Sequence, residues 1–175
     1  MDFTKLESKT LYQGHIMDLV VDKIRFDNGQ EAVREVAVHA SAAAVVALTP
    51  EGKIILVRQY RYAVEEETLE IPAGLLEPGE EPEEGARREL EEETGLKPLR
   101  MDHMFRFYSS PGFTNEALDV YLCDQMAPSV QHLDADEFID LVEVTPEEAF
   151  AMIRDGRIID GKTVAALSFY MATIK

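Results

Sequence analysis

Residues 74–96 constrain the fold of this chain more than any other part of the sequence. The segment starts as a loop that glycine and proline punctuate, and both residues favour turns. It continues into a run of strong helix formers, with Pro82 at a first-turn position and Gly95 just past the end. Because proline is tolerated in the first helical turn and glycine commonly ends a helix, we predict a helix over Pro82–Thr94.

Three glutamates on this helix point to a metal ion. Glu89, Glu92 and Glu93 stand at i, i+3 and i+4, so their side chains emerge on one face within reach of a common point. Three carboxylates there repel one another, and a hard, oxygen-seeking cation relieves the repulsion. We expect Mg²⁺, with Mn²⁺ or another divalent cation as the alternative. The competing interpretation is a solvated acidic helix.

Neighbouring residues on the helix have supporting roles in this hypothesis. Arg88 can reach back to Glu80 or along the helix to Glu92, and can hold a carboxylate in position by a bidentate pair. Ala86 and Leu90, four residues apart, form a narrow apolar stripe that would dock the helix on a sheet.

Together these residues match the Nudix box, G-x5-E-x7-R-E-U-x-E-E-x-G-U with U aliphatic, at every position. The chain therefore resembles the Nudix hydrolase family. The resemblance implies an α+β chain with a Nudix fold, an α/β/α sandwich with a mixed sheet, in which the box forms a loop, a helix and a second loop. It also implies hydrolysis of the pyrophosphate of a nucleoside diphosphate derivative, assisted by the bound metal.

The same resemblance assigns roles inside the box. Glu89 and Glu93 would be metal ligands, Glu92 a third ligand that binds directly or through water, and the backbone carbonyl of Ala73 another. Glu80 and Arg88 would support them.

The family often supplies a base for the attacking water from a loop after the box. Residues 133–139 form a short acidic loop before a strand and resemble that element. Glu137 is the first choice for the base or an additional metal ligand, and Asp134 and Asp136 are the alternatives. An ordinary solvated acidic turn is the competing interpretation. The predicted catalytic group is Glu92, Glu137, Arg88 and Glu80.

Features outside the box indicate the substrate. Residues 58–62, 69–74 and 109–116 resemble the ADP-ribose pyrophosphatase group of the family, and Pro111 falls fifteen residues past Leu96, where that group carries its marker proline. The guanidinium of Arg61 suits a phosphate, and an aromatic ring such as that of Tyr60, Tyr62 or Phe113 could stack on adenine. A polar sheet edge is the alternative interpretation of Arg61 and the tyrosines. The predicted substrate-binding residues are Arg34, Arg61, Glu70, Pro111 and Phe113.

Composition limits partners and location. The 34 acidic and 17 basic residues give a formal charge of −17, which disfavours nucleic acid and anionic membranes as partners. Cys123 is the only cysteine, so a disulfide within the chain and a multi-cysteine zinc site are excluded. The N-terminus does not resemble a signal peptide and no apolar run is long enough to span a membrane, so we expect a cytoplasmic protein. The four histidines are isolated and receive no catalytic role.

Apolar patterning predicts two regions. Residues 1–39 would form an antiparallel ribbon of two strands, residues 12–25 and 32–39, joined by an Asn-Gly turn, and residues 40–175 the Nudix domain. Such a ribbon needs a surface to cover Ile16, Leu19, Val21 and Ile24, so we expect a homodimer. The other predicted strands are residues 42–48, 53–60, 101–108, 117–123 and 139–144, and the other helices are residues 146–155 and 162–173.

Two alternatives to ADP-ribose hydrolysis stay open. The nearer one is a Nudix hydrolase of a sugar nucleotide, a dinucleotide polyphosphate or FAD. The other is a sensor of Nudix fold that binds ADP-ribose without cleaving it, which the intact box argues against.

Overall fold

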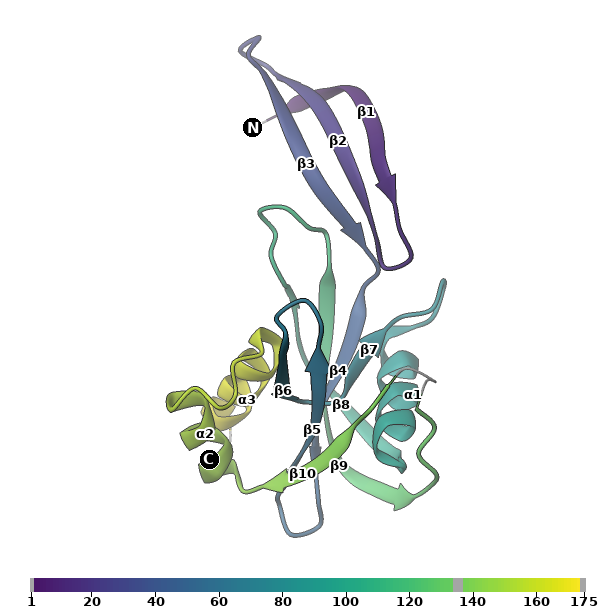
Figure 1. The fold of residues 1–175 in the computed structure, drawn as a ribbon, viewed down its shortest axis with the longest axis vertical. Helices are drawn as coiled ribbons and strands as arrows, with labels where there is room; N and C mark the ends of the chain where they lie inside the picture. Colours follow the sequence, from purple (N-terminus) through teal and green to yellow (C-terminus); the bar gives the residue numbers. More distant parts are fainter. Residues whose placement is uncertain (1, 134–136, 174–175) are drawn as a thin grey trace. The chain divides into compact units, whose positions relative to one another are not determined.

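The computed structural model describes residues 2–133 and 137–173. By their contacts they divide into two compact units, one made of residues 2–41 and 108–117 and the other of residues 42–107, 118–133 and 137–173. Figure 1 draws the strands and helices of both units.

The first unit is a three-stranded antiparallel sheet in the order β1-β2-β3. Its strands are β1 (Phe3–Gln13), β2 (Met17–Phe26) and β3 (Glu31–His39). The sheet has three strands, so the prediction of two strands is wrong. The chain turns at Gly14, whose N–H donates to the carbonyl of Met17 at 3.1 Å. Tyr12 therefore belongs to an additional strand, which pairs with β2 along its length. Every residue of β1 is exposed, so this strand lacks the alternation that would have predicted it.

Residues 108–117 fold onto the end of β3 within the same unit. The N–H of Ala37 donates to the carbonyl of Phe113 at 2.8 Å. The side chain of Asn115 accepts from the N–H of His39 at 2.9 Å and donates to its carbonyl at 3.3 Å. These bonds give the loop a defined conformation despite its exposure.

The second unit is built on a mixed sheet in the order β10-β5-β4-β9-β8, with β6 beside β5 and β7 beside β4. Strands β4 and β9 run parallel, whereas β4 is antiparallel to β5 and β7. The strands are β4 (Ala42–Leu48), β5 (Ile54–Arg61), β6 (Glu66–Glu70), β7 (Ala73–Leu75), β8 (Leu96–Tyr108), β9 (Ala117–Pro128) and β10 (Asp140–Val144).

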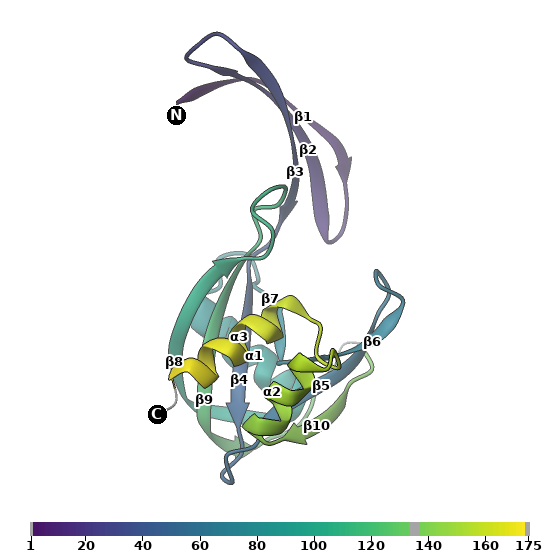
Figure 2. The ribbon, with the colours of Figure 1, turned by 90° about the vertical axis from the view of Figure 1, so that its left-hand side faces the viewer.

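Helices cover both faces of this sheet, as Figure 1 shows and as Figure 2 shows from the side of α2 and α3. Ala44 and Val46 of β4 pack in the cluster beneath α2 (Pro146–Arg154) and α3 (Gly161–Thr173). Their neighbours Ala43 and Val45 pack in the cluster beneath α1 (Pro82–Thr94). The unbroken apolar run of β4 thus follows from burial on both faces, and the predicted α/β/α sandwich is confirmed.

The boundaries show what local pattern can predict. Helix α1 spans Pro82–Thr94, the range that the terminal proline and glycine predicted. Strand β8, however, begins at Leu96 rather than Met101, because Gly95 in the left-handed conformation (φ 68°) turns the chain directly into the sheet. Strands β6 and β7 were not predicted, since they are too short to show a period. None of the described helices is long and apolar enough to cross a membrane.

Candidate active site

Helix α1 places the glutamates of the box above β7. Ala86 and Leu90 are fully buried against the sheet, as their spacing predicted. Gly74 of β7 lies so close to Glu89 that a Cβ atom at this position would overlap the Glu89 carboxylate. Only glycine therefore allows strand and carboxylate to approach each other this closely.

Arg88 uses all five of its N–H donors within the box, which makes it an orienting residue. Its Nε and Nη2 form a bidentate pair with Glu80 at 2.9 and 3.0 Å. Its Nη1 donates to Glu89 at 2.7 Å and to Glu92 at 3.0 Å, and Nη2 also donates to the carbonyl of Leu75 at 3.0 Å. The arginine thus joins the loop before the helix to two of the predicted ligands.

Glu93 is the most buried of the three helical glutamates, with 3% of its surface exposed. Its Oε2 accepts a hydrogen bond from the N–H of Ala73 at 3.2 Å. The side chain of Glu89 is mostly buried, and that of Glu92 is 40% exposed. The structure therefore brings Glu89, Glu93 and the backbone of residues 73–74 together, with Glu92 at the solvent side.

The electrostatics of this group call for positive charge. Burial raises the pKa of Glu93 to about 8, and the charges of Glu89 and Glu137 act in the same direction against the Ala73 hydrogen bond and the charge of Lys162. Burial also raises the pKa of Glu89, against its hydrogen bond from Arg88. Glu137 therefore lies near enough to both glutamates to affect their ionisation, as its predicted role requires.

The C-terminal end of helix α1 adds further negative charge near these glutamates. The last turn of α1 contains no basic residue, and Glu91, Glu92 and Glu93 lie there. The C-terminal end of a helix carries partial negative charge, so carboxylates at this end are unfavourable without a counter-charge. The oxygen donors, their burial and their mutual repulsion fit a hard divalent cation.

The side chains as placed do not form a closed coordination shell. In the described part of the chain, no three His, Cys, Asp or Glu side chains converge closely enough to hold a metal ion. Arg88 binds Glu89 and Glu92, and Glu93 is turned toward the N–H of Ala73. The residues that could hold a cation are Glu89, Glu92, Glu93, Glu137 and the carbonyl of Ala73.

Arg61 and Glu70, both predicted to bind substrate, bind each other. Arg61 donates from Nε and Nη2 to the two carboxylate oxygens of Glu70 at 2.8 and 2.6 Å. Glu70 is 1% exposed, and it also accepts hydrogen bonds from Thr68 and Lys162. The Arg61 side chain is 44% exposed, so the arginine is the member of this pair that ligands can reach.

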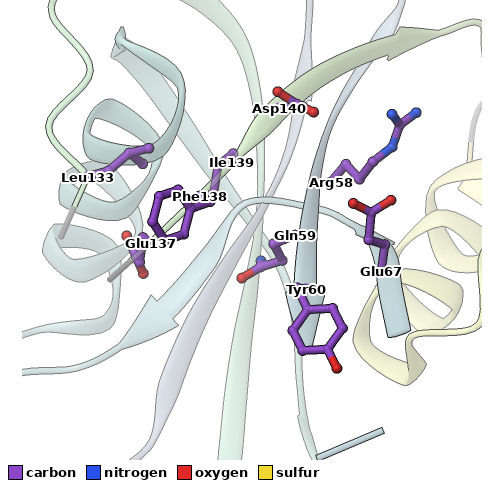
Figure 3. Close-up of a pocket in the computed structure, with 9 residues that line it drawn as sticks. All are labelled: Arg58, Gln59, Tyr60, Glu67, Leu133, Glu137, Phe138, Ile139 and Asp140. Carbon is purple, nitrogen blue, oxygen red and sulfur yellow. The ribbon is translucent and has the colours of Figure 1, made fainter. Parts of the chain in front are cut away.

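A hollow of about 350 Å³ lies beside Glu137. Figure 3 shows Glu137 and Phe138 at one side of it, Gln59 and Tyr60 in the middle, and Arg58 and Glu67 at the other side. Tyr60 offers an exposed ring there, which suits a planar group. The alternative bases Asp134 and Asp136 lie outside the described residues.

The remaining predicted substrate residues belong to the first unit. Arg34 donates to the carbonyl of Val33 at 2.9 Å and lies over the ring of Phe26. Phe113 is 61% exposed, and Pro111 lies in the same loop.

A model of the NUDIX domain matches residues 38–167, which include this entire set of carboxylates. The chain belongs to the Nudix family. It is accordingly a Nudix pyrophosphohydrolase, as its intact box predicted.

Individual Nudix proteins resemble the chain over nearly its whole length. An ADP-ribose pyrophosphatase from Bacillus subtilis is 42% identical over 94% of this chain and 92% of its own. A methanol dehydrogenase activator from Bacillus methanolicus is also 42% identical, over 94% of this chain and 90% of its own. The solved structure of an ADP compounds hydrolase superposes with a TM-score of 0.88, covering 98% of this chain and 94% of that one at 22% identity, which supports the shared fold.

Sequence reasoning missed one group beside the Nudix site. Asp160, Lys162 and Thr163 precede or begin α3, and Lys162 binds Glu70. An aspartate followed by glycine and threonine at the start of a helix is a capping signal, but pattern does not reveal which strand the capped end will meet.

Proposed function

We propose that this Nudix enzyme hydrolyses the pyrophosphate of ADP-ribose to AMP and ribose 5-phosphate with the help of a divalent cation. Mg²⁺ is the first candidate for that cation. The observation that carries the proposal is the buried pair Glu89 and Glu93 against the glycine of β7, beside Glu137. The choice of ADP-ribose is supported by the relative named ADP-ribose pyrophosphatase and by the flanking residues that resemble that group.

The residues divide the work of the reaction. Glu89, Glu92, Glu93 and the carbonyl of Ala73 would hold the cation, and Arg88 keeps the first two oriented. When bound, the cation neutralises charge on the pyrophosphate and lowers the pKa of its bound water.

Proton transfer and substrate binding fall to other side chains. Glu137 would accept a proton from the attacking water. The oxygen of that water would bond to one phosphorus, and the bridging oxygen would leave bonded to the other phosphorus. Arg61, half exposed on β5, would bind a phosphate, and Phe113 would stack on the adenine.

The deciding experiment compares AMP release from ADP-ribose with Mg²⁺ present and after its removal by chelator. We expect turnover that depends on the cation and that exceeds turnover of a sugar nucleotide, a dinucleotide polyphosphate and FAD. A preference for one of those three would replace ADP-ribose in the proposal, and tight binding of ADP-ribose without AMP release would favour the sensor.

We also propose a cytoplasmic homodimer that assembles through the N-terminal ribbon, residues 1–39, with the Nudix domain in residues 40–175. Support comes from apolar side chains that this ribbon exposes, which a partner subunit could cover. The structure corrects which residues these are, because Ile24 is already buried while Ile16 remains 65% exposed. The exposed apolar set also includes Phe3, Leu11, Tyr12, Met17 and Val33.

A further inference from the structure

The four residues 70–73, from the last residue of β6 to the first residue of β7, are each held in place by a specific bond. The segment matters because Ala73 donates to Glu93 and lies next to Gly74, beneath Glu89. The bonds are Lys162 to Glu70, the N–H of Ile71 to Thr163 Oγ1 at 2.9 Å, the N–H of Val45 to the carbonyl of Pro72 at 2.9 Å, and the N–H of Ala73 to Glu93 Oε2 at 3.2 Å.

Two of these bonds come from one short stretch at the start of α3, which we call the α3 clamp: Asp160, Lys162 and Thr163. The carboxylate of Asp160 accepts from the N–H and the hydroxyl of Thr163 at 3.0 and 2.6 Å. The same carboxylate lies 3.1 Å from the ammonium of Lys162. Asp160 therefore fixes the other two side chains in the orientation that meets residues 70 and 71.

The clamp is buried, as a precise positioning device must be. Thr163 is fully buried, and the Lys162 side chain is 14% exposed. By contrast, Arg61, the other cation on Glu70, is 44% exposed. If Arg61 turns to a substrate phosphate, Lys162 still neutralises the buried Glu70 carboxylate, and the segment keeps its place.

We propose that the α3 clamp positions the backbone of Ala73 for the metal site, so that Lys162 and Thr163 control cation affinity without touching the cation. The inference rests on the proposed function only in taking Glu89, Glu93 and the Ala73 carbonyl as cation ligands. Residues that orient metal ligands typically influence affinity by about 10-fold to 100-fold when they are changed.

The test measures Mn²⁺ binding by the full chain without substrate, using electron paramagnetic resonance of the free ion. Lys162→Met removes the ammonium and keeps much of the side-chain volume, and Thr163→Val removes the acceptor for the Ile71 N–H with little change of shape. We expect each to weaken Mn²⁺ binding by about 10-fold or more. Thr163→Ser retains the hydroxyl and should bind Mn²⁺ within about threefold of the unchanged chain.

A second control separates positioning from general loss of stability. Met152→Ala removes a buried side chain of α2 from the cluster beneath α2 and α3, so it should lower the thermal midpoint while leaving Mn²⁺ affinity unchanged. Wild-type affinity in both Lys162→Met and Thr163→Val would overturn the proposal. Equal weakening by Met152→Ala would overturn it too, because affinity would then merely follow stability.

The Mn²⁺-binding test of the α3 clamp can fail or succeed independently of the ADP-ribose test of the proposed function. A chain that binds Mn²⁺ but hydrolyses another nucleotide in place of ADP-ribose contradicts the proposed substrate and leaves the clamp measurements valid. A chain that hydrolyses ADP-ribose with unchanged cation affinity in the clamp variants contradicts the clamp alone.

Discussion

Glu93 is a carboxyl group almost removed from water, and a cation would restore its charged form. Glu93→Gln keeps the side-chain shape and an acceptor for the Ala73 N–H, but it removes the charge. We expect turnover to fall on the order of 10²-fold or more with the fold intact, measured by AMP release and by circular dichroism. A loss below about threefold would remove Glu93 from the ligand set.

The matched control for this change is Glu83→Gln. Glu83 lies in the first turn of the same helix and forms an exposed pair with Arg87 at 2.8 Å. Because exposed pairs contribute little to stability, this variant should retain nearly full turnover.

Glu70 makes stability depend on pH. Burial would raise its pKa, but hydrogen bonds from Arg61, the charge and hydrogen bond of Lys162 and the hydroxyl of Thr68 together lower it from 4.5 to about 2. The folded pKa lies below the unfolded one, so the stabilisation is complete above pH 4.5 and is lost as pH falls toward 2. A shift of this size contributes on the order of 3 kcal/mol.

We therefore expect Glu70→Gln to reduce the fall in unfolding free energy between about pH 6 and pH 3 in urea titrations. Glu66→Gln, on the same strand and exposed, should leave that fall unchanged. An identical pH profile for wild type and Glu70→Gln would contradict the assignment.

At the scale of elements, the approach of β7 to α1 determines the geometry of the site. Gly74→Ala would drive a methyl group into the Glu89 carboxylate, so the strand and helix must separate or Glu89 must leave its place. We expect Mn²⁺ affinity and turnover each to fall about 10-fold or more. The variant should still unfold in a cooperative thermal transition, which shows that the fold is retained. Wild-type cation binding in Gly74→Ala would mean that Glu89 has freedom to move and is not confined by this strand.

The helices and strands differ in how well the sequence predicts them. The range of α1 and the contacts of Arg88 were predictable because they depend on spacing within one helix and its flanking loop. Strand β1 was not, because its exposed residues follow no period. Nor was the bond between Lys162 and Glu70, which joins residues distant in sequence and forms only when α3 packs beside β6.

At the scale of the whole molecule, two of the predicted substrate residues, Arg34 and Arg61, belong to different compact units. A homodimer that covers the exposed apolar side chains of residues 1–39 would allow Arg34 of one chain to serve the Nudix site of the other. Light scattering at micromolar concentration tests the assembly, and a monomer there would contradict it.

Mixing two inactive variants tests whether Arg34 crosses between subunits. Arg34→Ala and Glu93→Gln chains, unfolded together and refolded in equal amounts, should form mixed dimers as half of the population. In each mixed dimer one site combines an unchanged box with the unchanged arginine of the other chain, so about one quarter of wild-type turnover should return. If Arg34 acts within its own chain, every site carries one of the two changes and turnover stays at the level of the separate variants.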